Sequence, residues 1–434
     1  MRGLAGRFPL DPYTVFCVGQ ALAIWVQERG GSNEVVIGTD TRESGAWMAE
    51  LVAGGLKSMR STARFAGLIP TPGLAHVAKT GPFAAGVMIS ASHNPYQDNG
   101  IKIIDHSGFK LPDAEELILE EHLGVYLNGV ATPVRLALPV DEGIDREYIE
   151  HLASTATHDL KGLTIVVDGA NGAASHLGPA LFEKLGAKVI KIHCAPDGKN
   201  INLNCGSLHL DEVRKAVLST GADVGVAFDG DADRALFVSH SGKIIDGDAV
   251  LYLSALPLHK SGRLTEVIAT VMSNIGLEVA LKTHGIGLVR TPVGDKYVLQ
   301  EMQKRNAPLG GEQSGHVIFS DYATTGDGLL TALRVFEAMR ETGQTLDELT
   351  AAVKTFPQLL VNVKVASKRP LEELAGANEK IRHAETELGD AGRVVVRFSG
   401  TEPLARVMVE GPELTRVEHH AHAIAAAIKA DLGE

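Results

Sequence analysis

The feature that most constrains the fold is a pattern that occurs three times: an apolar strand, a glycine-rich polar turn and an amphipathic helix. The three copies are EVVIGTDTRESGAWMAELVAGGLKSM (34–59), LTIVVDGANGAASHLGPALFEKLGAKVI (163–190) and EVIATVMSNIGLEVALKTHGI (266–286). In each copy a β-branched run ends in glycine, aspartate or asparagine, and apolar residues follow at helical spacing. Strands that alternate with helices predict buried sheets. We therefore expect three similar mixed α/β domains.

The chain after residue 356 follows a different pattern. A strand begins in FPQLLVNVKV, and the remaining residues read strand, strand, loop, strand and helix, which predicts a C-terminal α+β domain. Turn-rich segments near residues 140, 240 and 356 mark the expected boundaries. The predicted domains are 1–140, 141–240 and 241–356, all α/β, and 357–434, which is α+β.

Charge and cysteine content narrow the class of protein. A formal net charge of −12 argues against wholesale binding of nucleic acid, whose phosphates would be repelled, although a locally basic cleft can still bind a small anion. The three cysteines, Cys17, Cys194 and Cys205, form no CxxC pair, which favours reduced thiols. Apolar runs fall short of the ~20 residues of a membrane span, and the N-terminus lacks a signal-peptide pattern. We expect a cytoplasmic protein that binds neither nucleic acid nor membrane.

The segment GVMISASHNPYQDNGIKII (86–104) places a serine at the tip of a strand. Ser92 follows an apolar run, Pro95 disfavours helix at Asn94, and Asn94 and Asp98 favour turns. A serine hydrolase is disfavoured, because the chain contains no GxSxG elbow. Two interpretations remain: a polar turn whose serine caps backbone groups, or a serine that carries a phosphoryl group.

The segment GADVGVAFDGDADRALFVS (221–239) carries three alternating aspartates at the end of a strand, Asp229, Asp231 and Asp233. Carboxylates this close repel one another, and a bound divalent cation removes that penalty. Ligands that are all oxygen favour Mg²⁺, Mn²⁺ or Ca²⁺ over zinc. An EF-hand is excluded, because Arg234 and His240 occupy its glycine and glutamate positions. A solvated acidic turn is the alternative.

Two further segments carry polar side chains in loops. In APLGGEQSGHVIFSDYATTGDG (307–328), Glu312, Ser314 and His316 alternate, so they share one side of an extended loop and suit hydrogen bonding to sugar hydroxyls, although a purely structural histidine is the alternative. In VVVRFSGTEPLARVMVEG (394–411), one turn combines arginine, hydroxyl and backbone N–H donors, which favours binding of an oxyanion. The residues of that turn are Arg397, Ser399, Gly400 and Thr401, with Arg406 as a second arginine. The histidines of VEHHAHAIAAAIKA (417–430) are interpreted as a solvated helix face.

In their order along the chain and in their residues, these four segments resemble the α-D-phosphohexomutase family, and the resemblance covers essentially the whole chain. The resemblance rests on ISASHNPYQDNGIKI, GEQSGHVI, RTPVGDKYV, TTGDG and SGTEPLARVMVE. It implies a four-domain α/β enzyme in which one loop from each domain faces a central active-site cleft. Within the family the motifs are closest to the branch that acts on glucosamine phosphates, since the mannose and glucose branch usually has a methionine at the position of Gln313.

The resemblance also implies roles for individual residues. Ser92 would carry the phosphate, and with Asp229, Asp231 and Asp233 would hold one Mg²⁺ per chain. Lys102 would assist proton transfer, Arg234 would lie against the transferring phosphoryl group, and His316 would act as an acid or base. Residues that would bind the substrate are Arg2, His93, Lys296, Glu312, Ser314, Arg397, Ser399, Gly400, Thr401 and Arg406.

The implied activity is an isomerisation. Glucosamine 6-phosphate and glucosamine 1-phosphate would interconvert through a phosphoserine enzyme and glucosamine 1,6-bisphosphate, which feeds synthesis of UDP-N-acetylglucosamine and the cell wall. The alternatives are a mutase for mannose or glucose phosphates, and a sugar-phosphate-binding protein without turnover. A homodimer is compatible with the sequence. One departure is that family members usually begin with a strand and a Gly-Thr-Asp-Gly-Ile turn before Arg-Gly, whereas this chain opens at Met1, Arg2 and Gly3, so the first strand is expected to be absent.

Overall fold

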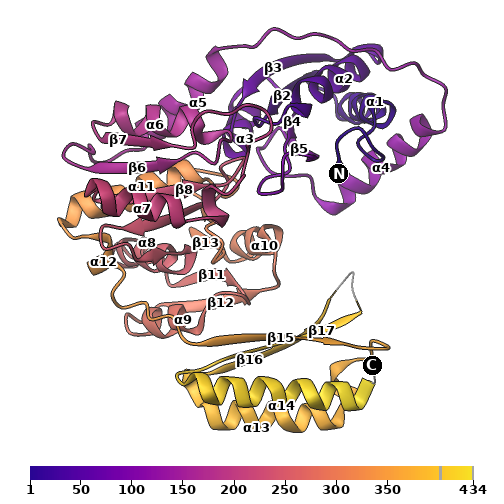
Figure 1. Ribbon diagram of the computed structural model, residues 1–434. Helices are drawn as coiled ribbons and strands as arrows, with labels where there is room; N and C mark the ends of the chain where they lie inside the picture. Colours follow the sequence, from indigo (N-terminus) through magenta and orange to yellow (C-terminus); the bar gives the residue numbers. More distant parts are fainter. Residues whose placement is uncertain (400–402, 433–434) are drawn as a thin grey trace.

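Four units, each with its own β-sheet, follow one another in chain order from the top of Figure 1 to its base. The structure is a computed structural model that describes residues 1–399 and 403–432. The N-terminal unit lies at the upper right of the figure, and the C-terminal unit lies at the bottom. The three-domain repeat expected from the sequence is thus present as three helix-covered sheets, followed by a smaller fourth one.

The first sheet has the order β1-β5-β4-β2-β3. Its strands are β1 (Arg2–Leu4), β2 (Glu34–Thr39), β3 (Thr62–Leu68), β4 (Ala85–Ile89) and β5 (Asp98–Asp105), and its helices are α1 (Pro12–Arg29), α2 (Ser44–Ser58), α3 (Thr71–Thr80) and α4 (Asp113–Leu127). The second sheet has the order β10-β9-β8-β6-β7. Its elements are α5 (Gly143–Ser154), β6 (Thr164–Asp168), α6 (Ala174–Lys184), β7 (Lys188–Ile192), α7 (Asp211–Thr220), β8 (Val224–Phe228), β9 (Ala235–Ser239) and β10 (Ile244–Ile245).

The third sheet has the order β12-β11-β13-β14, and the fourth has the order β15-β17-β16. The third unit contains α8 (Gly247–Lys260), β11 (Glu266–Thr270), α9 (Ile275–Lys282), β12 (Gly287–Thr291), α10 (Asp295–Arg305), β13 (Leu309–Gly311), β14 (Val317–Phe319), α11 (Gly328–Thr342) and α12 (Leu346–Leu349). The fourth contains β15 (Gln358–Lys364), α13 (Ala375–Leu388), β16 (Arg393–Phe398), β17 (Leu404–Glu410) and α14 (Leu414–Leu432). Single 3₁₀ turns occur at Gly206–Leu208, Leu371–Glu373 and Gly389–Ala391.

The four predicted motifs occupy equivalent places in the four sheets. Each lies in the connection between two neighbouring antiparallel strands: β4 and β5, β8 and β9, β13 and β14, and β16 and β17. Every residue of β4 and of β8 is buried, because helices cover both faces of these central strands. Burying one aliphatic side chain stabilises a fold by about 1.5–3 kcal/mol, so the strands that carry the first two loops are firmly anchored.

The second and third units share one hydrophobic core. Helix α11 brings Phe336 against two phenylalanines of the second unit, with ring centroids 5.1 Å from Phe182 and 6.1 Å from Phe237. Edge-to-face pairs of this kind add to the burial of the rings themselves. Because Phe336 of α11 packs into the core of the second unit, the second and third units are tightly joined. The domain boundaries at residues 140, 240 and 356 stay predictions.

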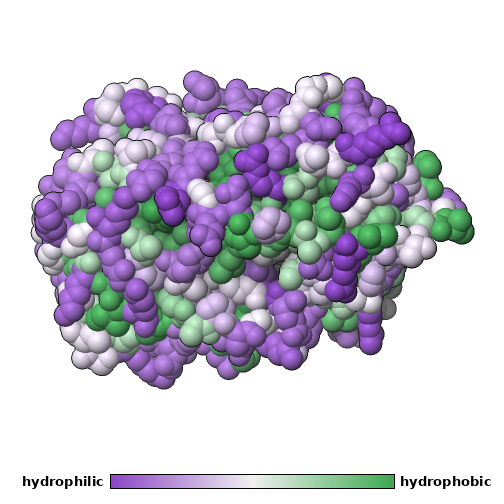
Figure 2. All heavy atoms as spheres, turned by 90° about the horizontal axis from the view of Figure 1, so that it is seen from above, coloured by the Kyte–Doolittle hydropathy of each residue, from purple (hydrophilic) through white to green (hydrophobic). Residues whose placement is uncertain are grey.

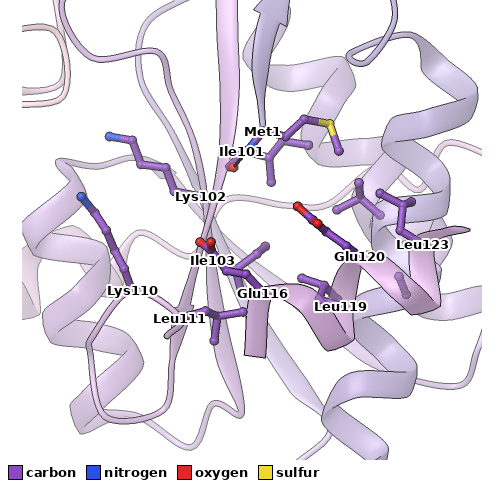
Figure 3. A pocket seen from close by; sticks show the side chains of 12 residues that line it. Met1, Ile101, Lys102, Ile103, Lys110, Leu111, Glu116, Leu119, Glu120 and Leu123 are labelled. Atoms are coloured by element: carbon purple, nitrogen blue, oxygen red, sulfur yellow. Dashed lines mark hydrogen bonds between the residues drawn. The ribbon is translucent and has the colours of Figure 1, made fainter. Parts of the chain in front are cut away.

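The N-terminus differs from the expectation. Arg2–Leu4 forms strand β1, antiparallel to the start of β5, and the amino group of Met1 donates to the carbonyl of Ile101 at 3.0 Å. Beyond β1 a pocket of about 360 Å³ lies between β5, α1 and α4 (Figure 3). Apolar side chains of β5 and α4 line it, together with Glu116 and Glu120. A first strand is therefore present, but it covers only part of the edge of β5.

Two expectations for the C-terminal unit are wrong. Helix α13 lies between the first two strands, so the order is strand, helix, strand, strand, helix. His420 on α14 is only 2% exposed, and its Nε2 lies 3.0 Å from Oε2 of Glu387 on α13, so the histidines do not all lie on a solvated face. Helix α14 packs against α13 and the sheet, which buries one side of it.

Hydrophilic side chains cover most of the face seen in Figure 2, and hydrophobic residues form smaller patches between them. Among residues 1–399 and 403–432, no helix has the length and apolar character needed to cross a membrane.

Candidate active site

Ser92 stands at the start of the loop between β4 and β5. It is buried, and its φ of 53° lies in the left-handed region, which non-glycine residues seldom occupy. Its Oγ donates a 2.7 Å hydrogen bond to Oδ2 of Asp229 and lies 3.3 Å from Nδ1 of His93. The hydroxyl predicted to carry a phosphate thus contacts the acidic loop of the second unit, 137 residues further along the chain.

The three aspartates occupy the turn between β8 and β9. Asp229, Asp231 and Asp233 are all buried, and one carboxylate oxygen from each lies within 4.8 Å of the others. Oδ1 of Asp229 accepts the N–H of Arg234 at 3.2 Å, and Oδ2 of Asp231 accepts from Oγ1 of Thr71 at 2.5 Å. Contacts from the first unit therefore hold one side of the acidic turn.

The carboxylates differ in pKa because positive neighbours are unevenly distributed. Burial, and then repulsion by Asp233 and Asp231, raises the pKa of Asp229 well above its usual range. Burial also opposes ionisation of the other two, but Lys102 lowers the pKa of Asp231, and His316 lowers the pKa of Asp233 well below its usual range. The protein thus offsets the cost of ionisation for Asp231 and Asp233, whereas Arg234 and Ser92 offset it only in part for Asp229.

The residues of this turn fit a divalent cation. Oδ1 of Asp231 and Oδ1 of Asp233 are buried and accept no hydrogen bond from the described part of the chain. A buried carboxylate oxygen without a partner is costly, and a cation would satisfy it. The donors are all carboxylate oxygens, with the Ser92 hydroxyl beside them, which is the ligand set of a hard divalent ion.

Cationic side chains surround Ser92 and the aspartates. Nζ of Lys102, on β5, lies 2.5 Å from Oδ2 of Asp231. Burial alone would lower the pKa of Lys102, but Asp231 raises it overall, so the amine is held charged. Nε of Arg234 lies 3.8 Å from Oδ1 of Asp233, and Nη1 of Arg2 donates to the side chain of Asn94 at 3.4 Å.

His93 lies among these cations. Burial, and then the charges of Arg234 and Arg2, lowers its pKa, which favours a neutral imidazole beside Oγ of Ser92. The structure therefore brings four of the predicted residues around the three aspartates, Ser92, His93, Lys102 and Arg234, and Arg2 contacts the Ser92 loop at Asn94.

The predicted sugar loop lies beside Arg234. A pocket of about 460 Å³ lies between the second and third units, and residues of this loop form part of its wall. Its lining residues are Arg234, Asp246, Thr270, Met272, Val293, Glu312, Gln313 and Ser314. Oε1 of Glu312 accepts the N–H of Gly294 at 3.2 Å, and Oε2 accepts from Ser314 at 3.3 Å. Nε2 of Gln313 donates to Asp246 at 3.2 Å. The pocket combines polar side chains with the apolar Met272 and Val293, and it has enough volume for a hexose ring.

His316 points into the protein instead of into that pocket. It is 2% exposed, its Nδ1 lies 3.5 Å from Oδ2 of Asp233, and its Nε2 accepts the N–H of Gly326 at 3.1 Å. Burial opposes protonation of His316, but Asp233 raises its pKa overall, so Nδ1, which faces Asp233, carries a proton. In this arrangement His316 supports a carboxylate of the acidic turn.

Lys296 and Lys110 join the first and third units. Lys296 pairs with Asp113 of α4, and Lys110 pairs with Asp295 at the start of α10. The charge of Lys110 lowers the pKa of Asp295 to about 2, against the effect of burial. Both pairs border a pocket of about 370 Å³ between the two units. Lys296 therefore lies at an interface beside the predicted site and is bound to an acidic partner there.

The predicted phosphate loop lies apart from the other three. Arg397 lies one residue before the end of β16 and is paired in register with Arg406 of β17, and the carbonyl of Ser399 accepts a 2.6 Å hydrogen bond from Lys368. Gly400 and Thr401 lie outside the described residues. Figure 1 shows β16 and β17, which flank this loop, in the unit at the bottom of the view. The contacts described above join the other three loops to one another.

Four residues that contact these loops were not found from the sequence: Arg42, Thr71, Asn202 and Asp295. Arg42 and Asn202 hold backbone carbonyls of the Ser92 loop, and Thr71 and Asp295 contact Asp231 and His316. The run DTR directly after β2 could have indicated a role for Arg42, since an aspartate and an arginine that follow a buried strand need polar partners. The remaining three carry no local signal, because each acts on a loop from a distant part of the chain.

Comparison with known proteins identifies the class of enzyme. Profiles of the phosphoglucomutase/phosphomannomutase family match the chain throughout: α/β/α domain I over 1–125, domain II over 146–242, domain III over 246–356 and the C-terminal domain over 360–427. The chain belongs to this family, and it is an isomerase that moves a phosphoryl group within a sugar phosphate.

Individual relatives are named more narrowly. The chain is 54% identical to the phosphoglucosamine mutase of Solibacter usitatus over 100% of its own length and 98% of that protein. It is 48% identical to the phosphoglucosamine mutase of Koribacter versatilis, over 100% and 96%. A family protein of Burkholderia thailandensis shares the fold, with a TM-score of 0.83, 24% identity and coverage of 99% and 96%. N-acetylphosphoglucosamine mutase of Aspergillus fumigatus, solved with GlcNAc-6P and magnesium, shares it with a TM-score of 0.67, 18% identity and coverage of 99% and 94%.

Proposed function

We propose that the protein is a phosphoglucosamine mutase, which interconverts glucosamine 6-phosphate and glucosamine 1-phosphate. The observation that carries the chemistry is the 2.7 Å contact between Oγ of Ser92 and Asp229, within a group of three buried carboxylates. The names of two relatives, 54% and 48% identical to the chain, support the choice of sugar. The sugar pocket beside Arg234, with Glu312 and Ser314 in its wall, supports a hexose phosphate as substrate.

The reaction would use Ser92 as the store for one phosphoryl group. In the first half, a sugar hydroxyl attacks the phosphorus of phospho-Ser92, the P–Oγ bond breaks, and the hydroxyl proton passes to a base. The product is glucosamine 1,6-bisphosphate, which serves as intermediate and activator. In the second half, Oγ attacks the other phosphate of the turned sugar, and the leaving sugar oxygen takes up a proton.

The chain's own residues would position these groups. Lys102 and Arg234 border the transferring phosphoryl group with positive charge, and His93 lies 3.3 Å from Oγ. Lys102 would accept the proton of the attacking sugar hydroxyl and donate a proton to the leaving sugar oxygen. His316 would orient Asp233 through the contact between its Nδ1 and the carboxylate. Glu312 and Ser314 would bind sugar hydroxyls. When Mg²⁺ is bound by Asp229, Asp231, Asp233 and the Ser92 phosphate, it supplies Lewis-acid stabilisation of the transferring group.

The remaining phosphate needs a separate site. Arg397, Ser399, Gly400, Thr401 and Arg406 would hold whichever phosphate is not being transferred, and Arg2 and Lys296 would contribute from the first and third units. Because this hairpin stands apart from the other loops, binding would require the fourth unit to move toward the first. The three cysteines are free thiols, which agrees with a reducing, cytoplasmic location.

Replacement of Ser92 tests the covalent step. Ser92→Ala removes the atom that would carry the phosphoryl group, so we expect loss of turnover and loss of the phosphopeptide in mass spectrometry, with a thermal unfolding midpoint close to that of the wild type. Normal turnover in the variant would reject the covalent role. Relative kcat/KM for the 6-phosphates of glucosamine, glucose and mannose tests the substrate, and a higher value for glucose or mannose would reassign the sugar.

A further inference from the structure

The backbone conformation of Ser92 requires an explanation. Its φ of 53° is unfavourable for a residue with a Cβ, so the surrounding structure must hold it there. The conformation also matters, because it directs Oγ at Asp229 and the acidic group. Contacts to the N–H and to the C=O of Ser92 come from two different units of the protein.

The contacts from the first unit originate at Asp40, directly after β2. Its Oδ2 accepts from Oγ of Ser90 at 2.6 Å, and that hydroxyl accepts the N–H of Ser92 at 2.9 Å. The same carboxylate pairs with Nε of Arg42 at 2.9 Å, and both side chains are fully buried. Arg42 then donates to the carbonyls of Ser92 and Asn94, both at 2.9 Å. Asp40 thus holds the N–H of Ser92 through Ser90 and the C=O of Ser92 through Arg42.

The contact from the second unit is made by Asn202. Its Nδ2 donates to the carbonyl of Ser92 at 2.9 Å and to that of Asn94 at 3.1 Å, the same two oxygens that Arg42 holds. The carbonyl of Ser92 also lies over Gly230 of the acidic turn, where a Cβ would approach it to 2.5 Å. The second unit therefore contacts the Ser92 loop at the same two carbonyls that Arg42 holds.

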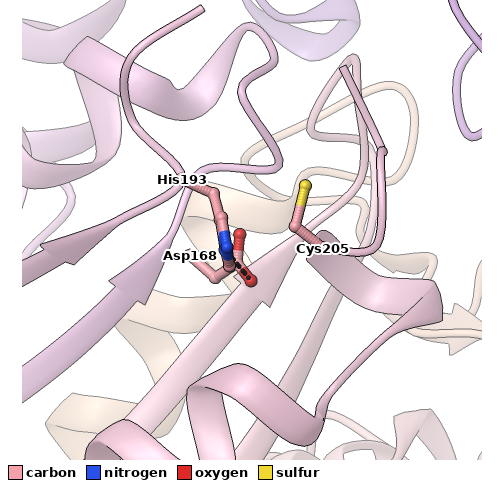
Figure 4. Close-up of side chains that lie close together, drawn as sticks. All are labelled: Asp168, His193 and Cys205. Carbon is pink, nitrogen blue, oxygen red and sulfur yellow. Dashed lines mark hydrogen bonds and ion pairs between the residues drawn. The ribbon is translucent and has the colours of Figure 1, made fainter. Parts of the chain in front are cut away.

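The loop that carries Asn202 is itself anchored. Asp168 ends β6, and its Oδ2 accepts from Nδ1 of His193 and from the N–H of Gly206, both at 3.0 Å (Figure 4). These two contacts tie down both ends of the segment 193–206. Cys205 lies beside them, and burial raises the pKa of its thiol to about 12, which keeps it neutral. The cluster thus serves as the base of the Asn202 loop.

We infer that Asn202 is a positioning residue for phosphoryl transfer: with Arg42 it clamps the carbonyls of Ser92 and Asn94 and so aims Oγ at the acidic group. The inference rests on the proposed function. Asn202 does not line the sugar pocket, so its loss should act on the transfer step and not on sugar binding. Misplacement of a reacting group by about 1 Å can cost about 10²-fold in rate.

Asn202→Gly tests the clamp, because glycine accepts the φ of 58° at this position and only the amide is lost. Asn204→Gly is the matched control. Asn204 lies on the same loop, has a φ of 52°, is exposed, and none of the described hydrogen bonds joins it to the Ser92 loop. Asn202→Asp adds a second variant, since a carboxylate of the same shape can donate no hydrogen bond and repels the two carbonyls.

The readouts are kcat and KM for glucosamine 6-phosphate, and the rate at which glucose 1,6-bisphosphate phosphorylates Ser92, followed by mass spectrometry. We expect Asn202→Gly and Asn202→Asp to slow both kcat and phosphorylation by about 10- to 100-fold with KM little changed, and Asn204→Gly to resemble the wild type. Wild-type rates in both Asn202 variants, or equal losses in the Asn204 control, would overturn the inference. Absence of phospho-Ser92 in the wild type would instead defeat the proposed function.

Discussion

Nζ of Lys102 lies 2.5 Å from Oδ2 of Asp231, although the two residues belong to different units and are 129 positions apart. The amine therefore partners a predicted metal ligand in the same acidic group that Oγ of Ser92 contacts. We expect Lys102→Met to lower kcat by about 10²–10⁴-fold with KM little changed, because the proton transfer loses its acid and base. Steady-state kinetics with saturating Mg²⁺ would measure this, and a kcat close to that of the wild type would contradict it.

Lys102→Met should also lower stability when no cation is present. Removing one partner of a buried pair leaves an uncompensated charge, which costs about 3–5 kcal/mol. Mg²⁺ should restore more of the free energy of unfolding in the variant than in the wild type, since the cation would replace the lost positive charge. Equal stabilisation of the two proteins by Mg²⁺ would argue that Asp231 does not contact the ion.

Asp229 offers a sharper test of the metal site. Its raised pKa means that the ionised carboxylate is disfavoured in the folded protein, so its ionisation costs stability as the pH rises above the unfolded value. Asp229→Asn removes this cost, and we expect the cation-free variant to be at least as stable as the wild type. Mg²⁺ at a hundred times its Kd should add about 2.7 kcal/mol to the wild type, but little to the variant. Thermal unfolding with EDTA or with Mg²⁺ would measure both, and equal stabilisation of the variant would contradict the site.

The acidic turn and the serine loop could be predicted from sequence because each is a local pattern. A buried strand is followed by aspartates at alternate positions, Asp229, Asp231 and Asp233, and another buried strand is followed by Ser92. Reactive side chains directly after a buried strand can be recognised from the sequence alone. The partners of these loops could not be predicted, because Asn202 reaches Ser92 across 110 positions. No spacing rule connects residues that only the packing of two units brings together.

Misses in the C-terminal unit have a different cause. The sequence of helix α13, AGANEKIRHAETEL, does not predict a helix, because it has few apolar residues and a glycine near its start, and only three of its residues are buried. The polar or small neighbours of His420 in the sequence predict a solvated position, yet α14 turns His420 toward Glu387. In both cases tertiary packing outweighed the local pattern.

Gln313 is expected to influence the choice of sugar. Its amide nitrogen donates to Asp246 in the wall of the sugar pocket, since an ionised carboxylate can only accept, and the amide oxygen remains as a hydrogen-bond acceptor. A carbonyl oxygen accepts hydrogen bonds from the ammonium group of glucosamine, and the nearby carboxylate favours its charge. We expect Gln313→Met to lower kcat/KM for glucosamine 6-phosphate by about 10-fold, equivalent to one charge-assisted hydrogen bond, and to leave the value for glucose 6-phosphate nearly unchanged. Equal losses for both sugars would assign Gln313 a general structural role.

A stacked pair of histidines predicts how stability depends on pH. The rings of His76 on α3 and His151 on α5 lie 3.9 Å apart, and burial, His151 and Lys79 lower the pKa of His76 to about 4. A histidine whose pKa falls on folding binds fewer protons in the folded state, so stability should decrease as the pH falls from about 6.5 toward 4. After allowance for solvent screening of the half-buried ring, the loss should be on the order of 1–2 kcal/mol. His76→Phe keeps the ring contact without the charge, and its thermal unfolding midpoint should fall less between pH 7 and pH 5 than that of the wild type. His209→Phe, at an exposed position, is the control, and the same pH dependence in all three proteins would contradict the prediction.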